Sequence, residues 1–456
     1  MTKLSSLYGL LAALLFACQS EGADPAPGPA APADPVQYGT PFADVPEARN
    51  ATVYQVNMRA FSSAGTFAGV QARLDSIQAL GINVLYLMPI HPVGKLRAFD
   101  SPYAVQDYTA VNPEFGTLAD LRALVAAAHA RRMAVVLDWV SNHTAWDNPW
   151  ITAHKDWYRQ DAAGTILNPS PFSDVAQLNF DSSPMRAEMI RALRYWVFEA
   201  NIDGYRFDYA DNQPQEFFTQ ALTSLNSIGT HRLLLIAEGS ANRSYYQAGF
   251  GLCYGFDFVS TLKDQVFAGG QSVRQLDVLT AANYQNAPAA YRVLRYTSNH
   301  DLNAYDGTPL EFFGGVQGSL AAFVVAAYQQ AAPMVYNGQE VACPVRLPFM
   351  GPRKVIDWTL NPAVTKEYRK ILRFRNGSAA VRSGMLTPYS SDDVCAFTKT
   401  AGAEQVLVLA NLRNRVVSYP VPAALPATWR HAFDGQPLTL GGTLTLQPYQ
   451  YLVLRN

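Results

Sequence analysis

Residues 134–143, AVVLDWVSNH, pass from an unbroken apolar run into a cluster of polar side chains. A short run that is apolar on both faces is typical of a parallel strand buried inside a sheet. Two later stretches repeat this pattern, because residues 204–208, GYRFD, end in an aspartate and residues 233–238, LLLIAE, end in a glutamate. Functional side chains of barrels gather where the strands end, so these polar residues are candidates for a site.

Similar apolar runs occur along most of the chain and define eight candidate strands. They are residues 52–58, 84–89, 134–138, 204–208, 233–238, 256–260, 293–299 and 333–336. Between many of them, apolar residues recur three and four positions apart, as at Leu118, Leu121 and Val125, which indicates helices. Eight strands with intervening helices favour an α/β fold, a (β/α)8 barrel, over residues 46–377. A doubly wound sheet is the rival, but no GxGxxG opens the first helix.

One connection within the expected barrel is too long for an ordinary loop. Residues 143–184 are rich in Pro, Asn, Asp and Ser and show no clear helical pattern until Pro184, a residue suited to a first helical turn. Loops longer than about 12–15 residues are usually functional or form small domains of their own. We therefore expect a small inserted domain after the third strand.

The pattern changes again after residue 377. Short strand-like runs separated by Gly, Asn, Asp or Pro occupy residues 394–400, 404–412, 416–421, 428–433, 442–446 and 449–454. Such spacing predicts an all-β C-terminal domain, a sandwich, over residues 378–456.

The first 17 residues, MTKLSSLYGLLAALLFA, combine Lys3 with an apolar run shorter than the roughly 18–20 residues that span a bilayer. This pattern predicts a secretory signal peptide. The sequence Leu15-Phe16-Ala17-Cys18 resembles the lipobox of bacterial lipoproteins, in which the cysteine becomes the lipid-bearing N-terminus. The proline-rich residues 18–45 predict an extended tether. We therefore expect an extracytoplasmic protein, periplasmic or at the cell surface, held to a bacterial membrane by a lipid on Cys18.

Composition excludes several classes of protein. Of the 456 residues 49% are hydrophobic and 16% charged, which suits a large core and not a disordered chain. The 35 Lys and Arg balance 36 Asp and Glu, so the basic excess of a nucleic-acid-binding protein is missing. Four cysteines are too few for a disulfide scaffold, and Cys253, Cys343 and Cys395 are expected to be buried core residues.

The polar residues at the predicted strand ends would meet at one mouth of the barrel. They are Asp138, Asn142, His143, Arg206, Asp208, Glu238, Asn299, His300 and Asp301. Two carboxylates that face one bond are the usual arrangement for glycoside hydrolysis. Arg206 lies two residues before Asp208 on the same strand face, which predicts a low pKa for Asp208, as a nucleophile needs. Glu238 closes an apolar strand without an adjacent cation, which predicts the raised pKa of a general acid.

From about residue 50 onward the chain resembles the α-amylase family, which consists largely of retaining glycoside hydrolases. Four stretches match the family's motifs in order: D-x-V-x-N-H at 138–143, G-x-R-x-D at 204–208, Glu238, and N-H-D at 299–301. The resemblance implies that Asp208 is the nucleophile, Glu238 the general acid/base and Asp301 the transition-state stabiliser. It also implies a set of substrate-binding residues, which are Tyr103, Asp138, His143, Arg206 and His300.

The activity implied by the resemblance is hydrolysis of α-1,4-glucosidic bonds in starch, glycogen or malto-oligosaccharides, through a covalent glycosyl-enzyme. The partner would be an α-glucan, with contact to the membrane only through the lipid. A neopullulanase or cyclomaltodextrinase and a 4-α-glucanotransferase use the same three carboxylates, so these alternatives stay open. A non-catalytic glucan-binding lipoprotein is a further alternative, but such a protein is expected to lack one of the three.

Three positions depart from the family's pattern. Asp211 and Asn212 stand where many members have Lys-His after the nucleophile, and Gln177 stands where the insertion often has a calcium-binding aspartate. Calcium prefers carboxylate oxygens, so Asn142 with Gln177 would be an incomplete metal site unless Asp138, Asp174 or Asp181 contributes. The sequence therefore requires no cofactor and leaves calcium as an alternative, and we expect a chelator to change activity and melting temperature little.

Aromatic residues crowd the expected mouth and the insertion. They are Trp139, Trp146, Trp150, Trp157, Tyr158 and Phe172. Aromatic faces suit both the apolar faces of glucose rings and the packing of a small inserted domain, so the sequence leaves both interpretations open.

Overall fold

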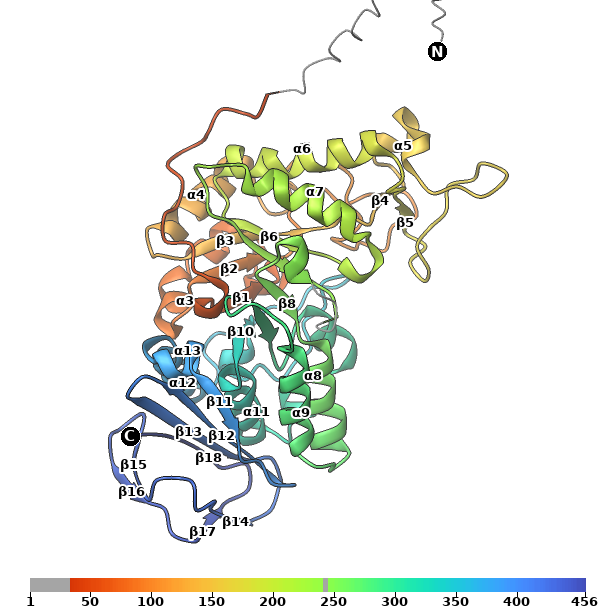
Figure 1. Cartoon of the computed structure of the whole chain (residues 1–456). Helices are drawn as coiled ribbons and strands as arrows, with labels where there is room; N and C mark the ends of the chain where they lie inside the picture. Colours follow the sequence, from red (N-terminus) through yellow and green to blue (C-terminus); the bar gives the residue numbers. More distant parts are fainter. Residues whose placement is uncertain (1–32, 241–244) are drawn as a thin grey trace, which may run out of the picture. The chain divides into compact units, whose positions relative to one another are not determined.

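Eight parallel strands close into a barrel in this computed structural model, which describes residues 33–240 and 245–456 (Figure 1). The strands follow one another around the barrel in the order β1-β10-β9-β8-β7-β6-β3-β2. They are β1 (Val53–Val56), β2 (Val84–Leu87), β3 (Ala134–Trp139), β6 (Gly204–Phe207), β7 (Leu234–Ala237), β8 (Leu252–Tyr254), β9 (Arg292–Arg295) and β10 (Ala331–Tyr336). Closure of the sheet confirms the predicted (β/α)8 barrel and excludes the doubly wound alternative. The expected signal peptide and Cys18 lie outside the described residues.

Alternate residues of the strands build two apolar layers. Val84 and Tyr86 belong to the cluster inside the barrel, whereas Leu85 and Leu87 belong to a larger cluster between the strands and the helices. The barrel helices include α3 (Leu74–Leu80), α4 (Leu118–His129), α6 (Ser183–Ala200), α7 (Gln215–Asn226), α9 (Arg274–Asn283), α11 (Val316–Tyr328) and α12 (Pro362–Gly377). Shorter helices are α1 (Met58–Phe61), α2 (Phe67–Gln71), α5 (Trp150–Ala153), α10 (Pro309–Phe312) and α13 (Ala379–Ser383). In the described part of the chain, no helix combines the length and apolarity that crossing a membrane requires.

The predicted strand at residues 256–260 is wrong. These residues form helix α8 (Phe256–Ser260), which continues into a π-helical stretch, Thr261–Ala268, and the sixth barrel strand is β8, just before them. Phe and Val in close succession suggested a strand, but Phe258, Leu262 and Val266 are buried at a spacing of four, which is the spacing of one helix face. The true strand is only three residues long and is enclosed by Gly251 and Gly255, so its pattern was too short to recognise.

The long connection after β3 forms a small ribbon with loops. Strand β4 (His143–Ala145) pairs antiparallel with β5 (Val175–Gln177), and the residues between them make α5 and the loops drawn in yellow in Figure 1. Helix α6 then starts after Ser182, whose hydroxyl accepts a hydrogen bond from Met185 N, with Pro184 in the first turn as predicted. The ribbon thus projects from the end of β3 where polar residues gather.

The C-terminal residues form antiparallel sheets, as predicted. Six strands pair in the order β11-β12-β13-β18-β15-β16, and β14 pairs with β17. Their bounds are β11 (Met385–Pro388), β12 (Val394–Ala401), β13 (Glu404–Asn411), β14 (Val417–Pro420), β15 (Thr428–His431), β16 (Pro437–Thr439), β17 (Thr443–Leu446) and β18 (Tyr451–Arg455). Both sheets contribute to one apolar cluster, for example through Leu407 and Tyr419, so they share a core. Strands β11 and β16 were not predicted.

Buried cysteines are part of the packed interior. Cys253, Cys343 and Cys395 are buried and unpaired, which confirms the prediction of core residues. Burial raises the pKa of the Cys253 thiol to about 12, which keeps it protonated and chemically inert at neutral pH.

Gly204, the first residue of β6, provides a test of the barrel. Its φ is +148°, and a Cβ at this position would lie 1.9 Å from the carbonyl oxygen of Leu234. Because neighbouring backbone cannot yield, we expect Gly204→Ala to lower the free energy of unfolding by roughly 2–4 kcal/mol. Gly229, where a Cβ would meet nothing within 4 Å, is the matched control, and Gly229→Ala should leave stability nearly unchanged. Equal melting temperatures for the two variants would contradict this account.

Candidate active site

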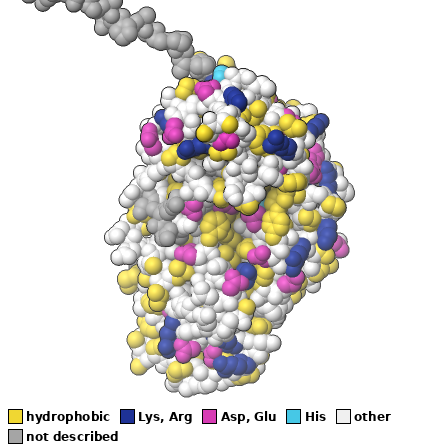
Figure 2. Space-filling view, turned by 90° about the vertical axis from the view of Figure 1, so that its right-hand side faces the viewer, with side chains coloured by type: hydrophobic (Ala, Val, Ile, Leu, Met, Phe, Trp, Pro, Cys, Tyr) yellow, Lys and Arg dark blue, Asp and Glu magenta, His cyan; other side chains and the backbone are white. Residues whose placement is uncertain are grey.

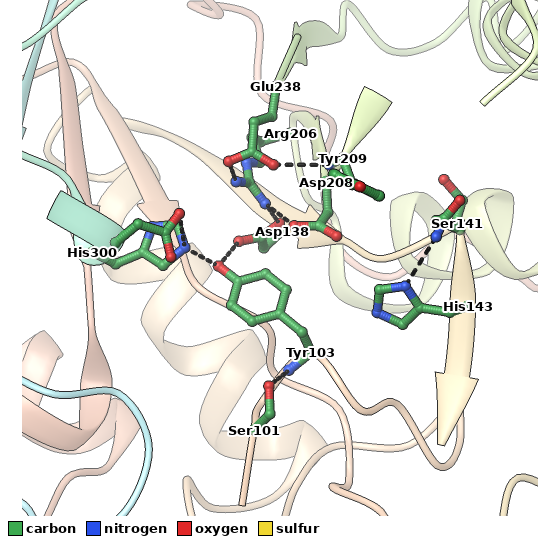
Figure 3. Close-up of polar contacts among 12 residues, drawn as sticks. Ser101, Tyr103, Asp138, Ser141, His143, Arg206, Asp208, Tyr209, Glu238 and His300 are labelled. Carbon is green, nitrogen blue, oxygen red and sulfur yellow. Dashed lines mark hydrogen bonds and ion pairs between the residues drawn. The ribbon is translucent and has the colours of Figure 1, made fainter. Parts of the chain in front are cut away.

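Arg206 occupies the centre of the barrel mouth. Its Nη1 lies 2.6 Å from Asp138 Oδ1 and 2.9 Å from Asp208 Oδ1, and its Nη2 forms an ion pair with Glu238 (Figure 3). The Arg206 side chain has no exposed surface. One guanidinium therefore bridges three carboxylates, and the prediction that Glu238 has no cation beside it is wrong. Arg206 reaches across from β6 to the end of β7, which sequence spacing does not reveal.

Backbone hydrogen bonds between neighbouring strands fix the positions of Asp208 and Glu238. Asp208 N donates to Trp139 O at 2.9 Å, and Glu238 N donates to Phe207 O at 2.9 Å. These bonds extend the ladder between neighbouring strands by one residue, so Asp208 and Glu238 leave adjacent strands side by side. Tyr209 N also donates to Glu238 Oε2 at 2.8 Å, which orients the glutamate from the side of β6.

Burial dominates the protonation of these groups. It raises the pKa of Asp208 to about 7, although Arg206 opposes this shift, and it raises the pKa of Glu238 well above its ordinary value. The predicted low pKa of Asp208 is therefore wrong, because Arg206 is shared with two other acids and burial outweighs its effect on Asp208. The raised pKa of Glu238 agrees with prediction, through burial and the negative charge of Asp208.

Tyr103 and His300 form a wall of the mouth. Tyr103 OH donates to Asp138 Oδ2 at 3.0 Å and lies 2.7 Å from His300 Nε2, and the two rings stack with centroids 5.4 Å apart. Gln55 Nε2 donates to His300 Nδ1 at 2.8 Å, so the ring carries its proton on Nε2. Burial lowers the pKa of His300 to about 3, which keeps the ring neutral. His300 Nε2 also lies 3.3 Å from Asp301, whose side chain is 47% exposed.

Asp138 lies beneath this wall and does not reach the surface of the mouth. Its Oδ2 accepts from Tyr86 OH at 2.7 Å as well as from Tyr103, and its side chain has no exposed surface. Asp138 and Arg206 have no exposed surface and bind other side chains of the mouth, and their contact with substrate stays a prediction. Tyr86 and Gln55 were not predicted as part of the site. The available clue was the presence of polar side-chain atoms within otherwise apolar barrel strands.

His143 lies at the start of the inserted ribbon. Figure 3 shows it on the opposite side of Asp208 from His300. Burial lowers the pKa of His143 to about 4, and its Nδ1 lies 3.2 Å from the amide nitrogen of Asn142. The structure thus brings together the predicted catalytic and substrate-binding residues, which are Tyr103, Asp138, His143, Arg206, Asp208, Glu238, His300 and Asp301.

The residues considered for calcium do not make a carboxylate site. Across residues 33–240 and 245–456, no group of three or more His, Cys, Asp or Glu side chains is arranged to hold a metal ion. Asp138 is committed to Arg206, and Asp181 lies 3.8 Å from Arg159. Gln177 and Asn142 offer amide oxygens, and calcium sites depend on charged ligands. These side chains do not fit the family's usual calcium site.

Known families match both parts of the chain. The model of the α-amylase catalytic domain matches residues 38–165, and that of the maltogenic amylase C-terminal domain matches residues 385–453. A crystal structure of an α-amylase from Lactobacillus plantarum is 28% identical, with a TM-score of 0.80, and the match covers 90% of this chain and 99% of that chain.

Two curated relatives show the range of activities among similar proteins. Alpha-amylase 2 of Dictyoglomus thermophilum is 25% identical over 86% of this chain and 71% of its own length. An α-1,4-glucan:maltose-1-phosphate maltosyltransferase of Rhodospirillum rubrum is 27% identical over 83% of this chain and 59% of its own length. The matches to the barrel and to the C-terminal sheets agree with each other, and the chain is similar to the α-amylase family of glycoside hydrolases over most of its length.

Proposed function

We propose that this protein hydrolyses α-1,4-glucosidic bonds of starch, glycogen or malto-oligosaccharides with retention of configuration, as an α-amylase does. The observation that carries the proposal is the contact of one guanidinium, that of Arg206, with both Asp208 and Glu238. Retaining enzymes keep the two carboxyl groups about 5–5.5 Å apart, whereas inverting enzymes need about 6.5–9.5 Å to admit a water molecule. Two acids bound to the same guanidinium suit the shorter spacing.

The two acids divide the reaction between them. Asp208 attacks the anomeric carbon as its ionised form, which Arg206 favours, while protonated Glu238 gives its proton to the leaving oxygen. The charge of Asp208 is one cause of the raised pKa of Glu238. That charge disappears when Asp208 becomes an ester, so the pKa of Glu238 falls. Glu238 is then ready to take a proton from the water that releases the sugar.

Tyr103 and His300, the uncharged wall beside the acids, suit the binding of the sugar whose anomeric carbon is attacked. His300 carries a proton on Nε2 and stacks on Tyr103, and Asp301 presents an exposed carboxylate next to it. These groups can donate to and accept from sugar hydroxyls without adding a net positive charge. We assign them to binding the glucose ring whose bond is cleaved, with Asp301 stabilising the transition state. The three carboxylates together argue against a protein that only binds glucan.

We also propose that the mature protein is held at a membrane by a lipid on Cys18, with the proline-rich residues as the tether. The support is the lipobox-like sequence before Cys18. In this proposal the enzyme acts outside the cytoplasm, on external or periplasmic glucan.

Removal of the nucleophile tests the first role. Asp208→Asn keeps the size of the side chain and one acceptor oxygen for Arg206 but cannot form the ester, so we expect turnover of maltoheptaose to fall at least about a thousandfold. Reducing-sugar release and the anomeric form of the product, followed by NMR, measure this. Asp181→Asn, on an exposed carboxylate that faces Arg159, is the matched control and should retain activity. Near-normal turnover in Asp208→Asn would refute the assignment.

Replacement of the acid tests the second role. Glu238→Gln should lose most activity on malto-oligosaccharides but much less on α-maltosyl fluoride, whose leaving group needs no proton. The unaltered enzyme should show a bell-shaped pH profile of kcat/KM on maltoheptaose. Its acid limb should lie well above pH 4, toward the pKa of about 7 of Asp208, because Asp208 must be ionised. Equal losses of Glu238→Gln on both substrates would exclude the acid role.

The anchor has its own test. Mass spectrometry of the membrane fraction should find Cys18 as a lipid-modified N-terminus, and Cys18→Ala should release the protein from membranes. A mature protein that begins elsewhere and carries no lipid would contradict the proposal.

A further inference from the structure

Three buried positive side chains lie at the end of the barrel opposite to the mouth. Arg292 is the first residue of β9, Arg375 belongs to the last turn of α12, and Lys399 belongs to β12 of the C-terminal sheet. Arg292 is 4% exposed, and Arg375 and Lys399 are fully buried. Asp208 and Glu238 follow the ends of parallel strands, whereas Arg292 begins one. The three cations are therefore separate from the candidate active site.

Hydrogen bonds and strand pairing place the two arginines next to each other. Arg375 Nη2 donates to Ala331 O at 3.0 Å, and Ala331 pairs with Val293, the residue after Arg292. Arg292 Nη2 in turn donates to the backbone oxygen of Arg382 at 3.3 Å, near the end of α13. The first residues of β9 and β10 thus share their surroundings with α12 and α13.

Helix α13 also brings Lys399 to this end of the barrel. A Cβ at Gly384, directly after the helix, would lie 2.7 Å from Thr400 O, so the helix ends against β12 beside Lys399. Figure 1 shows α13 next to the strands of the C-terminal sheet. Cys395 and Phe397 belong to the apolar cluster between the barrel strands and their helices. Lys399 lies on the same face of β12, because alternate residues of a strand share a face, and it therefore points toward the barrel.

The cations act on one another across these contacts. Burial, together with the charges of Arg292, Arg375 and Arg295, lowers the pKa of Lys399 to about 7. Burial also lowers the pKa of Arg292 and that of Arg375. Arginine nevertheless stays protonated in proteins, so two permanent positive charges remain inside the protein whatever the state of the lysine.

Each of the three side chains has a nitrogen without a hydrogen-bond partner. These atoms are Arg292 Nε, Arg375 Nε and Lys399 Nζ. The other nitrogens of the two arginines bind only uncharged oxygens, and no carboxylate of residues 33–240 or 245–456 forms an ion pair with any of the three side chains.

Surface cations of this protein differ from the buried group. Arg346, for example, pairs with Glu311 at 3.0 Å, and Figure 2 shows Lys and Arg close to Asp and Glu at several places on the face turned toward the viewer. Buried charges need a partner of opposite charge even more than exposed ones do, because burial removes the solvation by water. At the base of the barrel, the described residues do not supply that partner.

We infer that Arg292, Arg375 and Lys399 bind a small monovalent anion of about the size of chloride at the base of the barrel. The side chains are enclosed, so the ligand must be small, and their unpartnered nitrogens are the donors that an anion requires. The three residues come from β9, α12 and β12, so the anion joins the barrel to the C-terminal sheet. The inference does not depend on the proposed function.

Melting temperatures in two sodium salts test this inference. The protein is dialysed into sodium gluconate and titrated with sodium chloride at constant ionic strength. Gluconate is too large for an enclosed site, whereas chloride should raise the melting temperature by at least about 2 °C and then saturate, because it binds the folded state. Equal melting temperatures in the two salts would contradict the inference.

Lys399→Met distinguishes this site from any other that binds chloride. The substitution keeps the length of the side chain and removes the charge, so chloride affinity in the titration should fall at least about tenfold. In gluconate the variant should melt no lower than the unaltered protein, because a buried charge without a partner is removed. Lys370→Met is the matched control on α12. Lys370 is 51% exposed and pairs with Glu367, and its variant should keep the full response to chloride.

A full chloride response in Lys399→Met would overturn the inference, because the anion would then bind elsewhere. Bromide locates the site directly: crystals of the unaltered protein grown in sodium bromide should show an anomalous-scattering peak between Arg292, Arg375 and Lys399. No peak there, or a peak only at the barrel mouth, would also overturn it. This measurement needs no variant, so it decides the question even if Lys399→Met does not fold.

Discussion

The whole mouth of the barrel depends on one buried positive charge. Arg206 has no contact with solvent and would be too costly to bury without partners, and Asp138, Asp208 and Glu238 supply them. The dependence is mutual, since the guanidinium favours the ionised forms of Asp208 and Glu238 against the effect of burial. Because Arg206 binds all three, a shift of any one acid changes the electrostatic environment of the other two. The network acts as a unit, as catalytic groups commonly do.

The arrangement of strands around this charge explains why a barrel is needed. Asp138, Arg206 and Glu238 come from or follow three neighbouring strands, β3, β6 and β7, whose parallel register brings their ends level. Gly204 permits the close approach of β6 to β7 that this register requires. His300 and Asp301 enter after β9, on another side of the closed sheet. Only closure of the sheet lets residues almost a hundred positions apart, such as Arg206 and His300, share one site.

Most of the fold and the residues of the site could be predicted from the sequence, but their interactions could not. Short apolar runs located seven of the eight strands, and three of these runs end in Asp or Glu. The short strand β8 was missed because three residues carry too little pattern, and the helix after it has strand-like composition. The sequence predicted a low pKa for Asp208, because Arg206 lies two residues before it and suggests an ion pair between these two residues alone. In the folded chain Arg206 is shared, and burial outweighs its effect. The contacts of Tyr86 and Gln55 depend on which way strand residues face.

The inserted ribbon has a consequence for how such an enzyme diverges. His143 begins β4 at the mouth, and Phe172 lies on the loop just before β5, against the ring of Tyr209. Both are attached to a short element outside the barrel core, so changes in its length or loops leave the strand register intact. Mutation can therefore explore new substrates here while the barrel keeps its stability. This segment, whose loops lie outside the strand register of the barrel, also carries His143 to the mouth.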